Sequence, residues 1–129
     1  MKETTLTRQK LLEQRRELMA SLKYASFIQR AVLPDQKYME NLFEDFFIYH
    51  QPRDIVSGDF YYCVRKEDYI VVAVGDCTGH GVPGAFMSML GISLLNEITG
   101  EGTINLSTDE ILNTLRDKII SALHQEGKD

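Results

Sequence analysis

The stretch VGDCTGHGVPGAF, residues 74–86, decides how the rest of the chain is organised. It closes an uninterrupted apolar run, residues 70–74, and leads into a long apolar segment that begins at Pro83. An apolar run of this kind is typical of a strand covered on both faces, and proline is favoured at the first position of a helix. The stretch therefore predicts a strand, a glycine-rich turn and a helix, with Asp76 at the strand end.

The glycines of this turn match a phosphate-binding fingerprint by letter. Gly79, Gly81 and Gly84 spell G-x-G-x-x-G between a strand and a helix. However, the carboxylate of Asp76 would repel a pyrophosphate, and Pro83 lacks an N–H that should donate to it. The fingerprint also needs a second parallel strand after the helix, and the sequence continues instead with a polar loop and another helix. We expect no nucleotide site here.

A second aspartate belongs to the same region if residues 58–66 and 69–76 form a hairpin through a turn at 67–68. Asp59 and Asp76 would then lie together at its open end, where two carboxylates repel unless a cation neutralises them. Oxygen ligands suit magnesium or manganese, and the glycines let a backbone carbonyl face the ion as well. Aspartates at strand ends also cap turns, so these residues alone leave metal binding and turn capping open.

The first organised segment, residues 4–33, has no glycine or proline and predicts one helix that ends before Pro34. A helix of this length extends roughly 45 Å, more than a small body can cover. Coiled-coil-like spacing of apolar residues, interrupted by Arg15 and Gln29, favours pairing with another chain. The alternatives are a single core helix or packing of its C-terminal half on the body. The spaced residues are Leu11, Leu18, Leu22, Ala25 and Val32.

The remaining segments complete an α+β order of helix, three strands and two helices. Residues 34–41 predict a loop, residues 45–52 a strand that ends at a proline, and residues 83–98 a helix buried nearly all round. One antiparallel sheet with two helices over one face follows from this order. Its other face is left with nothing to cover it.

The last helix is predicted from a capping box, Ser107 and Glu110, followed by an amphipathic stripe and closed by Gly127. The stripe consists of Ile111, Leu115, Ile119 and Leu123.

Charge and composition exclude several classes of protein. The net charge of −5 divides into +4 for residues 1–33 and −9 for the rest, and an acidic body argues against nucleic acid. We interpret the basic arm as a solvated helix face rather than an RNA or lipid contact. The sequence has no signal peptide and no run near the ~18 apolar residues of a membrane span. We therefore expect a cytoplasmic protein, or the cytoplasmic part of a membrane-bound sensor.

The two cysteines, Cys63 and Cys77, are too few and too far apart for a disulfide framework. We interpret them as semi-buried free thiols.

Two blocks of the sequence carry a family resemblance. PRDIVSGDFYY (52–62) followed by VVAVGDCTGHGVPGAFMSMLG (71–91) resembles the PPM-type, metal-dependent protein serine/threonine phosphatases. It is most similar to their bacterial branch, the SpoIIE-like (sporulation stage II E) and sigma-factor-regulator phosphatases. SLKYASFIQRAVLP (21–34) resembles the end of the signalling helix that joins sensor domains to such phosphatases. The resemblance covers about residues 20–125.

This resemblance implies an α-β-β-α sandwich with a two-metal centre, Mn²⁺ or Mg²⁺, which activates water to attack phosphoserine or phosphothreonine. Asp59 would bind one metal, Asp76 would bridge both, and Cys77 would offer its backbone carbonyl. His80 would shape the turn, with general acid chemistry as the alternative. Arg53 would meet a phosphate or be a surface arginine.

The resemblance also implies an organisation and a biological setting. Residues 1–33 would be a signalling helix and residues 34–129 the N-terminal half of the phosphatase domain, so that this chain alone is expected to be inactive. The implied partners are a phosphorylated protein, such as an anti-sigma-factor antagonist, and an upstream sensor. Open sheet edges and an apolar face predict a homodimer or larger oligomer. A non-catalytic dimerising interaction module of a signalling protein is the alternative.

Overall fold

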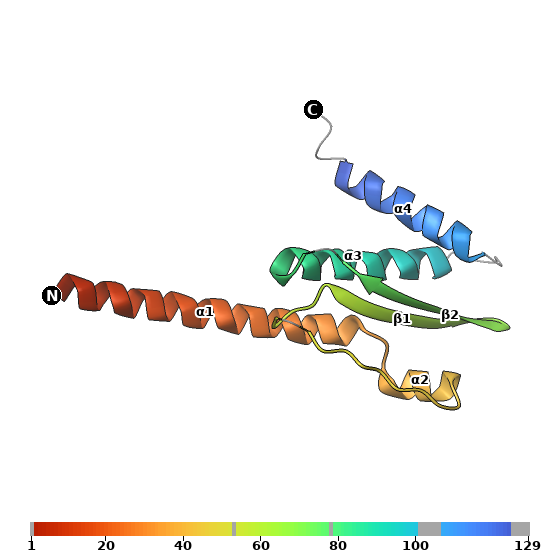
Figure 1. Ribbon diagram of the computed structural model, residues 1–129, viewed down its shortest axis with the longest axis horizontal. Coiled ribbons are helices and arrows are strands. Elements are labelled where there is room, and N and C mark those ends of the chain that lie inside the picture. Colours follow the sequence, from red (N-terminus) through yellow and green to blue (C-terminus); the bar gives the residue numbers. More distant parts are fainter. Residues whose placement is uncertain (1, 53, 78, 101–106, 125–129) are drawn as a thin grey trace.

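The computed structural model of the protein describes residues 2–52, 54–77, 79–100 and 107–124. The fold is α+β, with one antiparallel hairpin, a long N-terminal helix and two helices on the hairpin (Figure 1). The elements are α1 (Lys2–Val32), α2 (Gln36–Leu42), β1 (Asp59–Lys66), β2 (Tyr69–Asp76), α3 (Gly81–Gly100) and α4 (Thr108–His124). The predicted hairpin, the long first helix and the two C-terminal helices are confirmed.

The hairpin turns at residues 67–68, where Glu67 adopts a positive φ of 54°. Its register pairs Lys66 with Tyr69 at the turn and Asp59 with Asp76 at the open end. Because each strand has the same number of residues and no bulge, this register fixes the two aspartates opposite each other.

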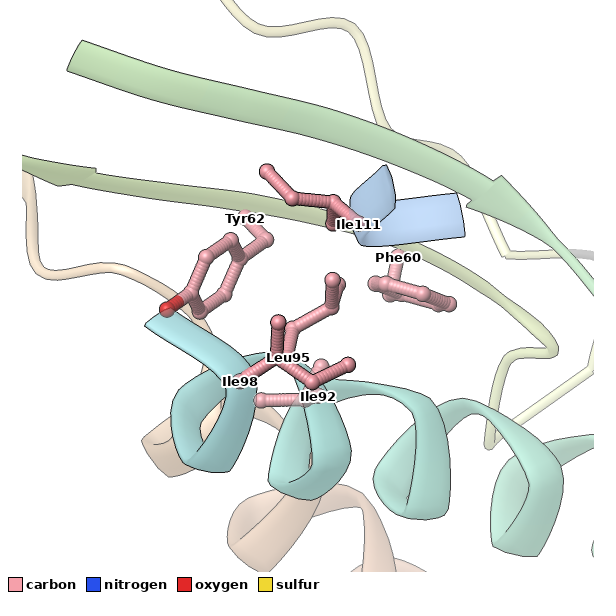
Figure 2. Close-up of a cluster of buried hydrophobic side chains, with 6 residues drawn as sticks. All are labelled: Phe60, Tyr62, Ile92, Leu95, Ile98 and Ile111. Atoms are coloured by element: carbon pink, nitrogen blue, oxygen red, sulfur yellow. The ribbon is translucent and has the colours of Figure 1, made fainter. Parts of the chain in front are cut away.

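Helix α3 is the centre of the molecule, since it contacts both strands, α1 and α4. Figure 2 shows the core between β1 and α3, to which α4 adds one side chain. By length and mean hydropathy (1.2) α3 resembles a membrane span, but three of its apolar side chains, Ile92, Leu95 and Ile98, are buried in this core. The buried cluster consists of Phe60, Tyr62, Ile92, Leu95, Ile98 and Ile111.

The ring of Phe60 lies between two glycines. A Cβ on its cross-strand partner Gly75 would lie 2.1 Å from Cε1 of Phe60, and a Cβ on Gly91 of α3 would lie 3.1 Å from Cζ. The ring is 7% exposed and therefore cannot move aside into solvent. The two glycines thus allow α3 to approach the strand ends closely.

Helix α4 begins as predicted. The N–H of Ser107 donates to Oε1 of Glu110 at 3.3 Å, and the Ser107 hydroxyl donates to the same oxygen at 2.6 Å. The first part of the predicted stripe packs on the core through buried Ile111 and half-buried Leu115, whereas Leu123 is 52% exposed. The predicted end at Gly127 lies outside the described residues.

Helix α1 projects far beyond the rest of the molecule (Figure 1). Residues 3–21 are all exposed, and only the last turns contact α3. Gln29 is the only buried residue of 3–32. The structure therefore has the C-terminal part of α1 packed on the body, while coiled-coil pairing of the exposed part stays a prediction.

Two predicted segments were wrong. Residues 34–41 contain helix α2 instead of a loop, held by buried Met39 and by the Tyr38 hydroxyl, which accepts the N–H of Arg65 at 2.9 Å. A helix this short depends on such contacts rather than on its own sequence. Residues 45–52 form no strand, because they have no ladder partner in the described structure; Phe47 and Tyr49 are 90% and 82% exposed.

The second face of the hairpin is open, as the sequence order indicated. Val72 and Val74 on this face are 59% and 84% exposed. Residues 43–51 run beside it and enclose an apolar groove of about 580 Å³.

The packing of Phe60 gives a first test. Gly75→Ala should destabilise the fold by about 1–3 kcal/mol, because the added methyl group forces the buried ring into Gly91. Gly100→Ala is the matched control, since nothing lies within 4 Å of its added Cβ, and it should be neutral or slightly stabilising. Urea unfolding measures both. Equal stability of Gly75→Ala and the unsubstituted chain would contradict this packing.

Candidate metal centre

The open end of the hairpin forms a small hollow of about 290 Å³. Asp59 begins β1 and Asp76 ends β2, and their pairing brings both carboxylates to this hollow. Both residues are exposed, so a ligand from solvent can reach them. The other lining residues are Asp54, Val56, Ser57, Gly58, Cys77, Gly79 and His80.

The two carboxyl groups influence each other. The pKa of Asp59 is raised above its ordinary value of 3.8, first by a side-chain hydrogen bond with Asp76, then by burial and by the negative charge of Asp76. The neighbouring His50 side chain opposes these effects and lowers the pKa of Asp59. Proximity of Asp76 thus favours the protonated form of Asp59, and a bound cation would reverse that preference.

Cys77 follows Asp76 and joins the turn to the start of β1. Its N–H donates to the carbonyl oxygen of Gly58 at 3.2 Å, and its side chain packs against the core. Burial, followed by the charges of Asp76 and Asp59, raises the pKa of the thiol. Because the side chain packs inward, the backbone is the part that suits a role in the hollow. Both cysteines are free thiols, Cys63 buried and Cys77 half-buried, as predicted.

Glycines allow the turn after Cys77 to fold tightly. Gly79 and Gly81 have φ of 88° and 73°, a left-handed conformation that other residues rarely adopt. A Cβ on Gly58 would lie 2.8 Å from the Cys77 carbonyl oxygen, and a Cβ on Gly84 would lie 2.8 Å from that of Gly79. The glycines therefore serve close backbone approach around the two aspartates.

The surroundings of this turn do not match a dinucleotide site. In the described part of the chain the strand before the glycines belongs to an antiparallel pair, and helix α3 is followed by helix α4. Pro83 is the third residue of α3 rather than the first, a position in the first turn where its missing N–H is still tolerated.

His80 lies at the edge of the hollow, beside Asp54. Nδ1 of His80 lies 3.4 Å from Oδ2 of Asp54, and its side chain is 66% exposed at the edge of the hollow. This exposed pair links the turn to the segment before β1. Arg53 lies outside the described residues.

Three residues that support Asp59 were not predicted. The Ser57 hydroxyl accepts the N–H of Asp59 at 3.0 Å and donates to its carbonyl oxygen at 3.1 Å. Nε2 of His50 lies 3.2 Å from the same carbonyl oxygen. Gln29 of α1 holds the Ser57 backbone. The only sequence signal was the polar Gln29 within an apolar seam.

The donor set fits magnesium or manganese in type. Two carboxylates and a backbone carbonyl are hard oxygen ligands, and magnesium commonly uses one or two carboxylates together with waters. Among the described residues no group of three or more His, Cys, Asp or Glu side chains could hold a metal. Metal binding by Asp59, Asp76 and the Cys77 carbonyl therefore stays a prediction that requires ligands besides these three.

Comparisons with known proteins agree with the second of the two blocks, residues 71–91. The family described as Stage II sporulation protein E (SpoIIE) matches residues 66–127. The solved structure of the SiaA-PP2C domain of Pseudomonas aeruginosa superposes with a TM-score of 0.71 and 40% sequence identity. The match covers 83% of this chain but only 43% of the solved chain. No curated protein matched in the corresponding search.

The family match covers β2, α3 and α4 and includes Asp76, whereas nearly all of β1, with Asp59, lies before it. The structural match extends over more of the chain and leads to the same class of enzyme. Residues 66–127 therefore match a SpoIIE-type domain, of the PP2C-like bacterial phosphatase class, and the chain spans only part of its solved relative.

Proposed function

We propose that this chain supplies one side of the active site of a metal-dependent phosphatase that hydrolyses phosphoserine or phosphothreonine in a protein substrate. The observation that carries the proposal is the register that places Asp59 opposite Asp76 beside a solvent-accessible hollow. When bound, a two-metal Mn²⁺ or Mg²⁺ centre supplies an activated water and offsets charge on the phosphoryl group.

The residues of this chain have distinct tasks in the proposal. Asp59 and Asp76 hold the metal ions, and the Cys77 carbonyl adds an uncharged oxygen. Gly79 and Gly81 add no side chains of their own to the turn, which leaves room for a phosphorylated residue to approach. His80 stays at the rim, where it shapes the turn with Asp54.

We further propose that phosphatase activity needs a longer protein than this chain. The chain spans 43% of the solved relative, and further carboxylates would have to complete a two-metal centre. We accordingly expect the isolated chain to turn over phosphoester slowly or not at all. On the resemblance alone, the substrate would be an anti-sigma-factor antagonist, the regulator an upstream sensor, and the location the cytoplasm.

Turnover tests this function. Asp76→Asn, made in the longest natural protein that contains this chain, should lower turnover of a phosphoserine peptide with Mn²⁺ on the order of 100-fold or more. The reason is that a metal ion contributes several kcal/mol to phosphoryl transfer. Asp117→Asn, on an exposed face of α4, is the control and should leave turnover unchanged. Equal rates for Asp76→Asn and the unsubstituted protein would contradict the proposed mechanism.

Thermal stability tests the carboxylate pair without catalysis. The raised pKa of Asp59 means that its contribution to stability is present below pH 3.8 and is lost as the pH rises through the raised value. Asp76→Asn removes the main causes of that shift, so its Tm without metal should exceed that of the unsubstituted chain at pH 7, with the difference vanishing at acid pH.

Mn²⁺ should raise the Tm of the unsubstituted chain and not that of Asp76→Asn, because only a folded pair of carboxylates binds the ion. Asp117→Asn again serves as the control. A lower Tm of Asp76→Asn at pH 7 in metal-free buffer would contradict mutual repulsion of the carboxylates.

We also propose that the chain forms a homodimer or larger oligomer through α1. Leu11 and Leu18, seven residues apart, are both 60% exposed, and burying such side chains against a second helix is favourable. This observation also favours the alternative function, a non-catalytic dimerising module. Absence of both Mn²⁺ binding and turnover would support that alternative.

Sedimentation at micromolar concentration measures the oligomer. The unsubstituted chain should sediment as a dimer or larger species, and Leu11→Lys combined with Leu18→Lys should reduce its mass to that of the monomer. Glu13→Lys places the same side chain off the seam and should have no such effect. A monomeric unsubstituted chain would refute the proposed assembly.

A further inference from the structure

The turn that carries Asp59 is held from outside the hairpin. Gln29, near the end of α1, forms two hydrogen bonds with the backbone of Ser57. Its Nε2 donates to the Ser57 carbonyl oxygen, and its Oε1 accepts the Ser57 N–H at 2.8 Å. Gln29 is 7% exposed and Ser57 is 5% exposed, so water does not readily replace either bond. A single side chain thus satisfies both backbone groups of one residue.

The same carboxamide also joins α3. Nε2 of Gln29 donates to the Ser88 hydroxyl at 2.9 Å, and Ser88 is fully buried. The Ser88 hydroxyl in turn lies 2.9 Å from the Ala85 carbonyl oxygen and 3.3 Å from that of Ser57. Three segments distant in sequence therefore meet at Gln29: the end of α1, the turn before β1 and the first half of α3.

Ser57 continues this connection to the metal centre. Its main chain is fixed by Gln29, and its hydroxyl bonds both the N–H and the carbonyl oxygen of Asp59. The route from α1 to the first carboxylate thus passes through one intermediate residue. No exposed flexible side chain intervenes along it.

The position of Gln29 in the sequence also indicates that it attaches α1 to the body. It interrupts the apolar seam of α1, where coiled-coil pairing would favour an apolar side chain. It is nevertheless the only buried residue of 3–32, while the leucines of this helix are exposed or half-buried. The attachment of α1 to the body therefore depends on a polar contact aimed at the Asp59 turn.

We propose that Gln29 is a positioning residue for the metal centre: through Ser57 it couples the seating of α1 on α3 to the placement of Asp59 opposite Asp76. The consequence for metal binding rests on the function proposed above, whereas the coupling from Gln29 to Asp59 does not. A merely structural glutamine would instead stabilise the whole body evenly.

Amide hydrogen exchange of the full chain tests the coupling without metal. Gln29→Met keeps the size and helix propensity of the side chain but removes its polar contacts, so exchange of the Asp59 N–H should accelerate about tenfold. Hairpin amides distant from the turn, such as that of Val64, should change much less. Gln14→Met makes the same replacement at an exposed position of α1 and should change neither.

A double-mutant cycle tests whether Gln29 acts through Ser57. Ser57→Ala removes the hydroxyl that bonds Asp59, so adding Gln29→Met should increase Asp59 exchange by less than twofold further. Additive effects, or equal acceleration at Asp59 and Val64 in Gln29→Met, would overturn the coupling.

Mn²⁺ titration separates this proposal from the proposed function. Gln29→Met should weaken Mn²⁺ binding about tenfold, while Gln14→Met should leave it unchanged. If no form of the chain binds Mn²⁺, the proposed metal centre fails, while the exchange result still decides the coupling.

Discussion

The ring of Phe60, enclosed by Gly75 and Gly91, is the constraint on which the rest of the structure depends. It sets how closely α3 approaches the hairpin, and α3 is the element that α1, α4 and both strands contact. Asp59 precedes this ring directly, and Asp76 follows its glycine partner. The carboxylate pair therefore lies beside the point where the hairpin packs closely against α3.

At this end of the hairpin, the arrangement that metal binding would need is unfavourable for the metal-free protein. Two carboxylates at adjacent strand ends favour protonation of Asp59 when no cation is present, which works against the charged pair that a metal would need. The buried network of Gln29, Ser57 and Ser88 does not contact the carboxylates, but it fixes the backbone that leads into Asp59. Such local tension is common where a fold holds a site ready for a ligand.

Much of this arrangement was predictable from the sequence, for identifiable reasons. The strands of the hairpin and helices α3 and α4 follow from apolar runs, turn residues and a capping box, all of which are local signals. Helix α2 and the unpaired course of residues 45–52 were missed, because both depend on contacts with distant segments. Of the site, Asp59 and Asp76 were placed by register. The hydrogen bonds of Ser57 and His50 to Asp59 follow no periodic sequence pattern, and the hold of Gln29 on Ser57 spans 28 residues.

The polar attachment of α1 has a consequence for how its release would be detected. Within residues 3–32 only Gln29 is buried and Leu22, Ala25 and Ser26 are half-buried, so separating α1 from the body would newly expose few side chains of this helix. Heat capacity and denaturant sensitivity both scale with the surface that becomes exposed. The contribution of α1 itself to calorimetry and urea titration would therefore be small, even though its detachment frees the backbone that carries Asp59.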